Sequence, residues 1–184
     1  MNVSRKFFNN KKILIYGMGK SGFSSYHFLK KKNYIKIYDD KIKIIKNKSI
    51  KKFFLEKSKI LKIKFDYIVI SPGINVNKCN LKNYLKKNSQ RIITDLDIFY
   101  SHYSKNKIIT ITGTNGKSTT AKLLNLILIN HKLDARLCGN IGNPVLLEKN
   151  ISKKTIFVIE ASSYQIDYSK IFKTNYAIIL NISP

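Results

Sequence analysis

The chain has no tryptophan, only two cysteines and only 10 acidic residues among its 184 residues. Cys79 and Cys138 lie in different segments without metal-ligand spacing, which argues against a disulfide framework and fits a reducing compartment. Long apolar runs are missing too. None approaches the ~20 residues that span a bilayer, and the run after the basic N-terminus is too short for a signal peptide. The sequence therefore predicts a cytoplasmic protein without membrane insertion.

The shortage of acidic residues leaves a net charge of +25. Basic surfaces attract polyanions, so one interpretation is a face that binds nucleic acid. The alternative is compositional: 32 of the 35 basic residues are Lys, they are scattered along the chain, and Ile and Asn, whose codons are also A/T-rich, number 30 and 19. We favour the compositional interpretation and expect no specific nucleic-acid partner.

Short, continuous apolar runs separated by turns and helix-length segments indicate parallel sheets with both faces covered, and hence an α/β fold. The polar stretch at residues 101–107 is the predicted domain boundary. We expect a Rossmann-like parallel-sheet domain over residues 1–104 and a P-loop domain over residues 105–184. The predicted strands are "KILIY", "IKIYD", "DYIVIS", "RIIT", "KIITIT", "TIFVIE" and "YAIIL".

A glycine-rich turn, "GMGKSG", follows the first predicted strand and opens a predicted helix. Gly17, Gly19 and Gly22 match the G-x-G-x-x-G pattern, in which glycines let backbone amides approach a phosphate at the helix N-terminus. Asp39 ends the next strand, where an acid meets a ribose hydroxyl. The ligand stays open between NAD and a uridine diphosphate, and the glycines alone also fit a turn that merely packs helix on strand.

The stretch "ITITGTNGKSTTAKLL" is a stronger nucleotide signal. A buried-type strand leads into a glycine loop, and a helix with apolar spacing at Leu123, Leu124, Ile127 and Leu128 follows it. Such a loop cradles phosphates with its amides, while Lys117 reaches the outer phosphates and the Ser118 hydroxyl can ligate Mg²⁺. The expected ATP-binding residues are Gly113, Thr114, Asn115, Gly116, Lys117, Ser118 and Thr119. Glu160, at a strand end, is a second candidate Mg²⁺ ligand.

These motifs together carry a family resemblance. "GTNGKST", "GNIGNP" and "EASSYQ" resemble the Mur ligases, ATP-dependent amide-forming enzymes of peptidoglycan precursor synthesis. The family's loop shares the shortened pattern, in which Ile111 stands where the first glycine of a P-loop would be. "GMGKSGFS" and "ISPGI" look most like the members that add D-glutamate to UDP-N-acetylmuramoyl-L-alanine. Ala161 and Tyr164 replace the more usual Leu and Phe, which are packing changes.

The resemblance implies an acyl-phosphate mechanism in which ATP and Mg²⁺ activate the alanyl carboxylate and the amine of D-glutamate displaces phosphate. Lys117 and Glu160 are the implied catalytic residues, and Ser118 and Glu160 the implied metal ligands. The implied substrate contacts are Lys20, Ser21, Gly22, Asp39, Asp40, Ser71, Gly73, Asn140, Ser162 and Gln165. The family's substrate would be bound by a monomer.

The chain stops soon after the strand "YAIIL". By family analogy we expect the central domain to be incomplete and the 184 residues alone to be inactive, because an open half-site does not exclude water. Two other readings remain. One is a nucleotide-binding remnant of such a ligase without catalysis, and the other is a redox domain in which "GMGKSG" binds NAD.

Overall fold

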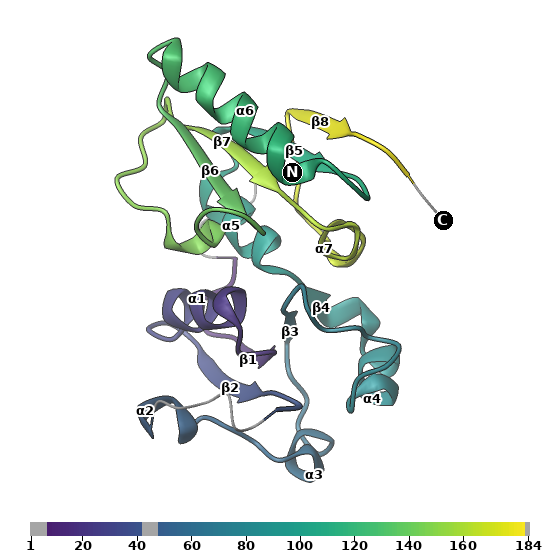
Figure 1. Ribbon diagram of the computed structural model, residues 1–184. Coiled ribbons are helices and arrows are strands. Elements are labelled where there is room, and N and C mark those ends of the chain that lie inside the picture. Colours follow the sequence, from purple (N-terminus) through teal and green to yellow (C-terminus); the bar gives the residue numbers. More distant parts are fainter. Residues whose placement is uncertain (1–6, 42–47, 183–184) are drawn as a thin grey trace.

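The computed structural model describes residues 7–41 and 48–182. The chain forms two four-stranded sheets with helices between their strands (Figure 1). The strands are β1 Lys12–Tyr16, β2 Tyr34–Tyr38, β3 Tyr67–Ile70, β4 Ile92–Ile93, β5 Lys107–Thr112, β6 Ala135–Gly139, β7 Ile156–Glu160 and β8 Tyr176–Ile179. The helices are α1 Lys20–Leu29, α2 Lys48–Lys51, α3 Lys57–Ile60, α4 Lys82–Lys87, α5 Asp95–Tyr103, α6 Lys117–Asn130 and α7 Ser163–Tyr168, with 3₁₀ turns η2 Ser89–Arg91 and η3 Val145–Leu147.

Every strand pairing is parallel, in the orders β2-β1-β3-β4 and β6-β7-β5-β8. The fold class predicted from the sequence, α/β with parallel sheets, is therefore confirmed. In both sheets the chain order reverses beside the first strand, β1 or β5. Ligands of open α/β sheets bind outside the carboxyl ends of the strands at such a reversal. The glycine turn after β1 and the P-loop after β5 lie at these two points.

The first sheet is covered on both faces, as its continuous apolar strands require. Ile13 and Ile15 face one hydrophobic cluster, and Leu14 and Tyr16 face another. The first cluster continues into the second sheet, where it includes Phe157, and the helix between the sheets, α5, contributes residues to it (Figure 1). The two sheets thus share one continuous core. The boundary at residues 101–107 remains a prediction.

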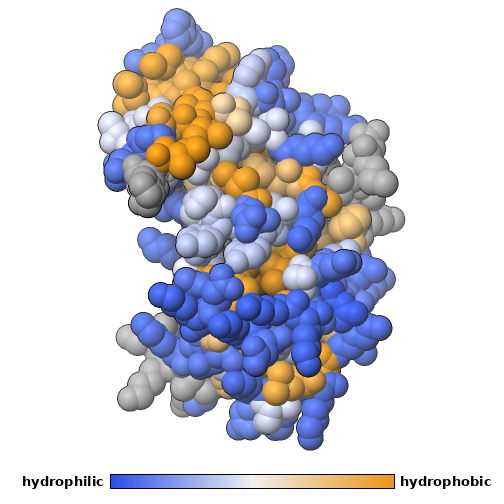
Figure 2. Space-filling model, turned by 90° about the vertical axis from the view of Figure 1, so that its right-hand side faces the viewer, coloured by the Kyte–Doolittle hydropathy of each residue, from blue (hydrophilic) through white to orange (hydrophobic). Residues whose placement is uncertain are grey.

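The second sheet is covered on its other face by α6. Leu124 and Leu128 pack toward Ile111 and Val158, as the apolar spacing of the helix requires. Leu123 and Ile127 are instead 58% and 45% exposed. Figure 2 shows apolar surface mainly on the half with the second sheet and mostly hydrophilic surface on the other half. The apolar residues of α6 therefore lie on two faces of the helix. Leu124 and Leu128 pack on the sheet, and Leu123 and Ile127 are exposed.

The described cysteines, Cys79 and Cys138, are both free. Burial raises the pKa of the Cys138 thiol well above its ordinary value. None of the helices in the described part of the chain combines the length and apolar character that crossing a bilayer requires.

Candidate functional site

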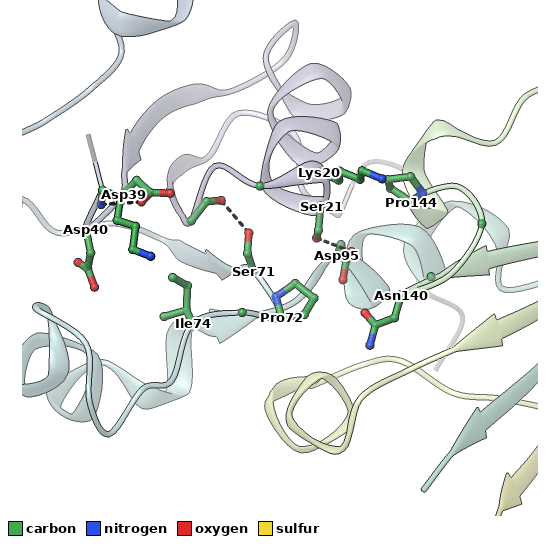
Figure 3. A pocket seen from close by; sticks show the side chains of 16 residues that line it. Lys20, Ser21, Asp39, Asp40, Ser71, Pro72, Ile74, Asp95, Asn140 and Pro144 are labelled. Carbon is green, nitrogen blue, oxygen red and sulfur yellow. Dashed lines mark hydrogen bonds between the residues drawn. The ribbon is translucent and has the colours of Figure 1, made fainter. Parts of the chain in front are cut away.

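A cavity of about 450 Å³ opens at the carboxyl ends of β1 and β3 and reaches the second sheet (Figure 3). Asp39 and Asp40 lie at one end of it, and Asn140 and Pro144 at the other. Seven of the ten predicted substrate contacts line this cavity: Lys20, Ser21, Asp39, Asp40, Ser71, Gly73 and Asn140. The structure therefore brings together residues from four separate motifs, which the sequence places up to 120 positions apart.

The acidic end of this first pocket is held in place by hydrogen bonds. Asp39 accepts the Met18 amide at 2.7 Å and the Lys41 amide at 2.8 Å, so its carboxylate fixes the backbone of the glycine turn. Asp40 accepts the Tyr16 hydroxyl at 2.7 Å. Burial, with this hydrogen bond as a smaller cause, raises the pKa of Tyr16, which therefore stays a neutral donor. The two carboxylates are thus ordered before any ligand arrives.

The glycine turn packs closely on the turn that follows β3. Ser71 donates to the Gly17 carbonyl oxygen at 2.7 Å. A Cβ on Gly22 would lie 1.8 Å from that same carbonyl oxygen, so no side chain fits there. Gly22 does not line the pocket but lets α1 approach the turn. The N-terminus of α1, whose first amides have no carbonyl partner within the helix, consequently lies at the cavity, which Lys20 and Ser21 line.

The second predicted site, the P-loop between β5 and α6, has the backbone that its glycines allow. Gly113 and Gly116 have φ values of +141° and +80°, which other residues rarely adopt. Lys117 Nζ donates to the Gly113 and Thr114 carbonyl oxygens at 2.6 and 2.8 Å, which folds its ammonium over the loop. The amides of the first turn of α6 have no carbonyl one turn before them in the helix. Loop, cation and helix N-terminus together suit the phosphates of a nucleotide.

Ser118 and Glu160 meet beside this loop. The Ser118 hydroxyl donates to Glu160 Oε2 at 2.7 Å, although the two residues are 42 positions apart. Glu160 is 5% exposed and ends β7, directly beside β5. A hydroxyl and a carboxylate are oxygen ligands of the kind that Mg²⁺ prefers, and Mg²⁺ takes its remaining ligands from phosphate and water. Within the described residues no group of three or more His, Cys, Asp or Glu forms a metal site.

Two predicted contacts, Ser162 and Gln165, form the N-terminal cap of α7. The Gln165 amide donates to Ser162 Oγ at 3.2 Å, and the Ser162 amide donates to Gln165 Oε1 at 3.1 Å. Gln165 is 2% exposed and its Nε2 donates to Asp95 Oδ1 at 3.1 Å. The structure places Gln165 in a buried network between the sheets, outside the lining of the first pocket.

Two further site residues did not emerge from the sequence. Asp95 lines the first pocket and accepts the Ser21 hydroxyl at 2.6 Å. Asn181 Oδ1 accepts the amides of Thr114 and Asn115 at 3.1 and 2.9 Å, which holds the first half of the P-loop. A signal for Asp95 was available, because "TDLD" is a helix start with an acid in the first turn. Nothing near Asn181 in the sequence indicates its contact with the loop.

Two family models match this architecture. "Mur ligase MurD-like, N-terminal domain" matches residues 11–93, the first sheet, and "Mur ligase middle domain" matches residues 111–184, the P-loop and the second sheet. The chain belongs to the Mur ligase family. The resemblance carried by the glycine turn, the P-loop and "EASSYQ" is thereby confirmed.

Curated Mur ligases are similar over nearly the whole chain. The UDP-N-acetylmuramoylalanine–D-glutamate ligase of Caldicellulosiruptor saccharolyticus is 37% identical over 95% of this chain and 41% of its own length. The ligase of the same name from Rickettsia prowazekii is 37% identical over 100% of this chain and 40% of its own length. The chain thus spans about two fifths of the length of these relatives.

Among solved structures, the fold is similar to UDP-N-acetylmuramate:L-alanyl-gamma-D-glutamyl-meso-diaminopimelate ligase (MPL) from Neisseria meningitides. The match has a TM-score of 0.54 at 16% identity and covers 95% of this chain and 61% of that one. At this identity the likeness shows the Mur ligase fold and nothing about substrate.

Proposed function

We propose that the chain provides the uridine-substrate site and the P-loop of an ATP-dependent, amide-forming Mur ligase. The reaction would add D-glutamate to UDP-N-acetylmuramoyl-L-alanine through an acyl-phosphate during peptidoglycan precursor synthesis in the cytoplasm. The observation that carries the proposal is the pocket of Figure 3, which joins the glycine turn of the first sheet to Asn140 of the second. The name of the relatives supports D-glutamate as the added amino acid.

The first pocket suits a uridine diphosphate sugar by shape and charge. We infer that Asp39 and Asp40 bind the nucleoside end and that the N-terminus of α1, with Lys20 and Ser21, binds the diphosphate. Ser71 and Gly73 form the wall between them. Asn140, at the far end, would then orient the part of the substrate that reaches toward the P-loop. We propose this assignment, with residues 1–104 as the first domain and 105–184 as the second.

The P-loop residues Gly113 to Thr119 would bind the nucleotide phosphates. When bound, ATP with Mg²⁺ would supply the phosphoryl group that activates the substrate carboxylate. Lys117 holds a positive charge over the loop, where charge develops during phosphoryl transfer. Ser118 and Glu160 would hold the metal ion, and Ser162 caps the helix beside them. Positioning and charge neutralisation are what this chemistry needs from a protein, since no side-chain nucleophile takes part.

A thermal-shift experiment tests the first site. A ligand that binds only the folded chain stabilises it by about 2.7 kcal/mol at 100 times its Kd. For a chain of this size we expect UDP, or UDP-N-acetylmuramoyl-L-alanine, to raise Tm by about 5 to 10 °C at that concentration. NAD and NADP at matched concentrations should leave Tm unchanged. A larger rise with NAD than with UDP would replace the proposal with a dinucleotide-binding function.

The basic surface leads to a second expected result. Within the described residues a single ion pair is present, between Arg136 and Asp134, so most lysines face water without an acid partner. Scattered lysines contact phosphates but do not read bases. We therefore expect weak binding of duplex DNA without sequence preference, lost by about 0.2 M salt in a fluorescence anisotropy titration. Tight, sequence-selective binding at that salt concentration would show that the surface is a nucleic-acid site.

A further inference from the structure

Asp95, the first residue of α5, lies between the two halves of the molecule and is 2% exposed. Its Oδ2 accepts the hydroxyl of Ser21, on the wall of the first pocket, at 2.6 Å (Figure 3). Its Oδ1 accepts Gln165 Nε2, from α7 of the second half, at 3.1 Å. One carboxylate therefore holds a side chain from each half.

The second arm of this network leads to the P-loop. Gln165 Oε1 accepts the Ser162 amide at 3.1 Å, and Ser162 follows the end of β7 by two residues. At that end, Glu160 accepts the hydroxyl of Ser118 from α6. The path from the first pocket to the P-loop helix thus runs through five side chains, with one short covalent step between Ser162 and Glu160.

The carboxylates and the amide side chain of this path are buried, whereas its serines are partly buried or exposed. Gln165 and Glu160 are 2% and 5% exposed, so water cannot replace their partners without cost. Ala161, between Glu160 and Ser162, is fully buried, and its amide donates to the Ile111 carbonyl oxygen of β5 at 3.0 Å. Desolvation raises the pKa of Asp95, and the hydrogen bonds from Ser21 and Gln165 act against that rise. The Ser21 hydroxyl is thus the point at which a ligand in the first pocket would act on this path.

We propose that Asp95 is a positioning residue that couples the first pocket to the P-loop, so that a uridine diphosphate in the first pocket changes the affinity of the P-loop for nucleotide. The inference rests on the proposed function of both sites. Coupling between binding sites is reciprocal, so ATP must change the affinity for UDP by the same factor. Asp95 lines the first pocket and acts on the P-loop through Gln165.

The test measures the Kd of Mg²⁺-ATP for the 184-residue chain by calorimetry, with and without saturating UDP, and the Kd of UDP with and without Mg²⁺-ATP. We expect both ratios to be equal and to differ from one by about fivefold or more, the usual size of such coupling. In Asp95→Asn each ligand should still bind, with ratios within about twofold of one. Asn has the same shape but is uncharged and presents Nδ2 in place of one carboxylate oxygen, so the two charge-assisted hydrogen bonds from Ser21 and Gln165 are lost.

Asp97→Asn is the matched control. Asp97 is on the same helix and fully buried, but its Oδ1 accepts the amides of Lys170, Ile171 and Phe172 and it touches neither pocket. This variant should lower Tm and keep the coupling ratio of the parent chain. Gln165→Met breaks the next link, keeps the backbone amide that caps α7, and should uncouple the sites as Asp95→Asn does.

The outcomes separate the two proposals. If UDP and ATP both bind the parent chain but independently, or if Asp95→Asn or Gln165→Met keeps the coupling, Asp95 is a structural residue and the inference is wrong while the proposed function stands. If neither UDP nor ATP binds the parent chain, the proposed function fails and the inference falls with it.

Discussion

Replacing Lys117 with Ala should weaken Mg²⁺-ATP binding at least tenfold, as measured by calorimetric titration. The Lys117 ammonium is held over the P-loop by the Gly113 and Thr114 carbonyl oxygens, where it would meet the nucleotide phosphates. A hydrogen bond between charged groups contributes about 1.5 to 3 kcal/mol, which corresponds to a factor of ten or more in Kd. Few single changes in this chain should cost nucleotide affinity more.

The control for this variant is Lys122→Ala. Lys122 lies on the same helix, is exposed and carries the same charge. Its replacement by Ala therefore removes the same long-range attraction without changing a contact of the loop. Its ATP affinity should stay within about twofold of the parent chain, because exposed charges contribute little. Equal ATP affinity in the Lys117 and Lys122 variants would show that "GTNGKST" is a structural turn. Tm of both variants should be measured, since Lys117 also ties the loop together.

Of the substitutions proposed for this chain, Gly22→Ala should lower the stability most. The new Cβ would lie 1.8 Å from the Gly17 carbonyl oxygen and 2.8 Å from Ser71 Oγ, and the nearer of these atoms is backbone that cannot move aside. Helix α1 would have to shift away from the glycine turn. Overpacking of this severity costs about 3 kcal/mol or more, which lowers Tm by about 6 to 12 °C in a chain of this size. UDP affinity should fall with it, because α1 carries Lys20 and Ser21.

Gly19→Ala provides the comparison within the same turn. A Cβ at Gly19 meets no atom within 4 Å, and its φ of −69° suits any residue. Thermal unfolding of this variant should occur within about 2 °C of the parent chain, because Ala fits at this position and makes the unfolded state less flexible. Equal Tm values for the Gly22→Ala and Gly19→Ala chains would contradict the close packing of α1 on the turn. Only Tm is compared here, because Gly19 lines the pocket.

The strands were predictable wherever they were apolar throughout. All seven predicted runs contain a strand. A strand covered on both faces needs a continuous apolar run, as in β1 and β3, whereas β8 is apolar but mostly exposed at the sheet edge. The remaining strand, β6, was missed. It lies at the edge of its sheet, has only two buried residues and contains Arg136, so it has no such run. Tertiary pairing with β7 makes it a strand.

The candidate site was predictable only where it is local in sequence. The glycine turn and the P-loop are contiguous motifs whose backbone requirements dictate residue types. Asp95 and Asn181 work through partners 74 and 66 positions away, so their neighbours in sequence say nothing of their contacts. The same reason explains why the sequence does not reveal the buried contact of Gln165. Its motif marked it as a substrate contact, and the fold gives it a buried carboxylate as partner.

Helix α5, which belongs to the proposed first domain, shares its hydrophobic core with the second sheet. Phe99 of α5 meets Phe157 of the second sheet edge to face, with ring centroids 4.8 Å apart, and both side chains are fully buried. Cutting the chain between residues 104 and 105 would leave Phe99 in solvent on one piece and Phe157 on the other. Each piece would then expose apolar side chains that the whole chain buries, so we expect both pieces to be less stable than the whole chain.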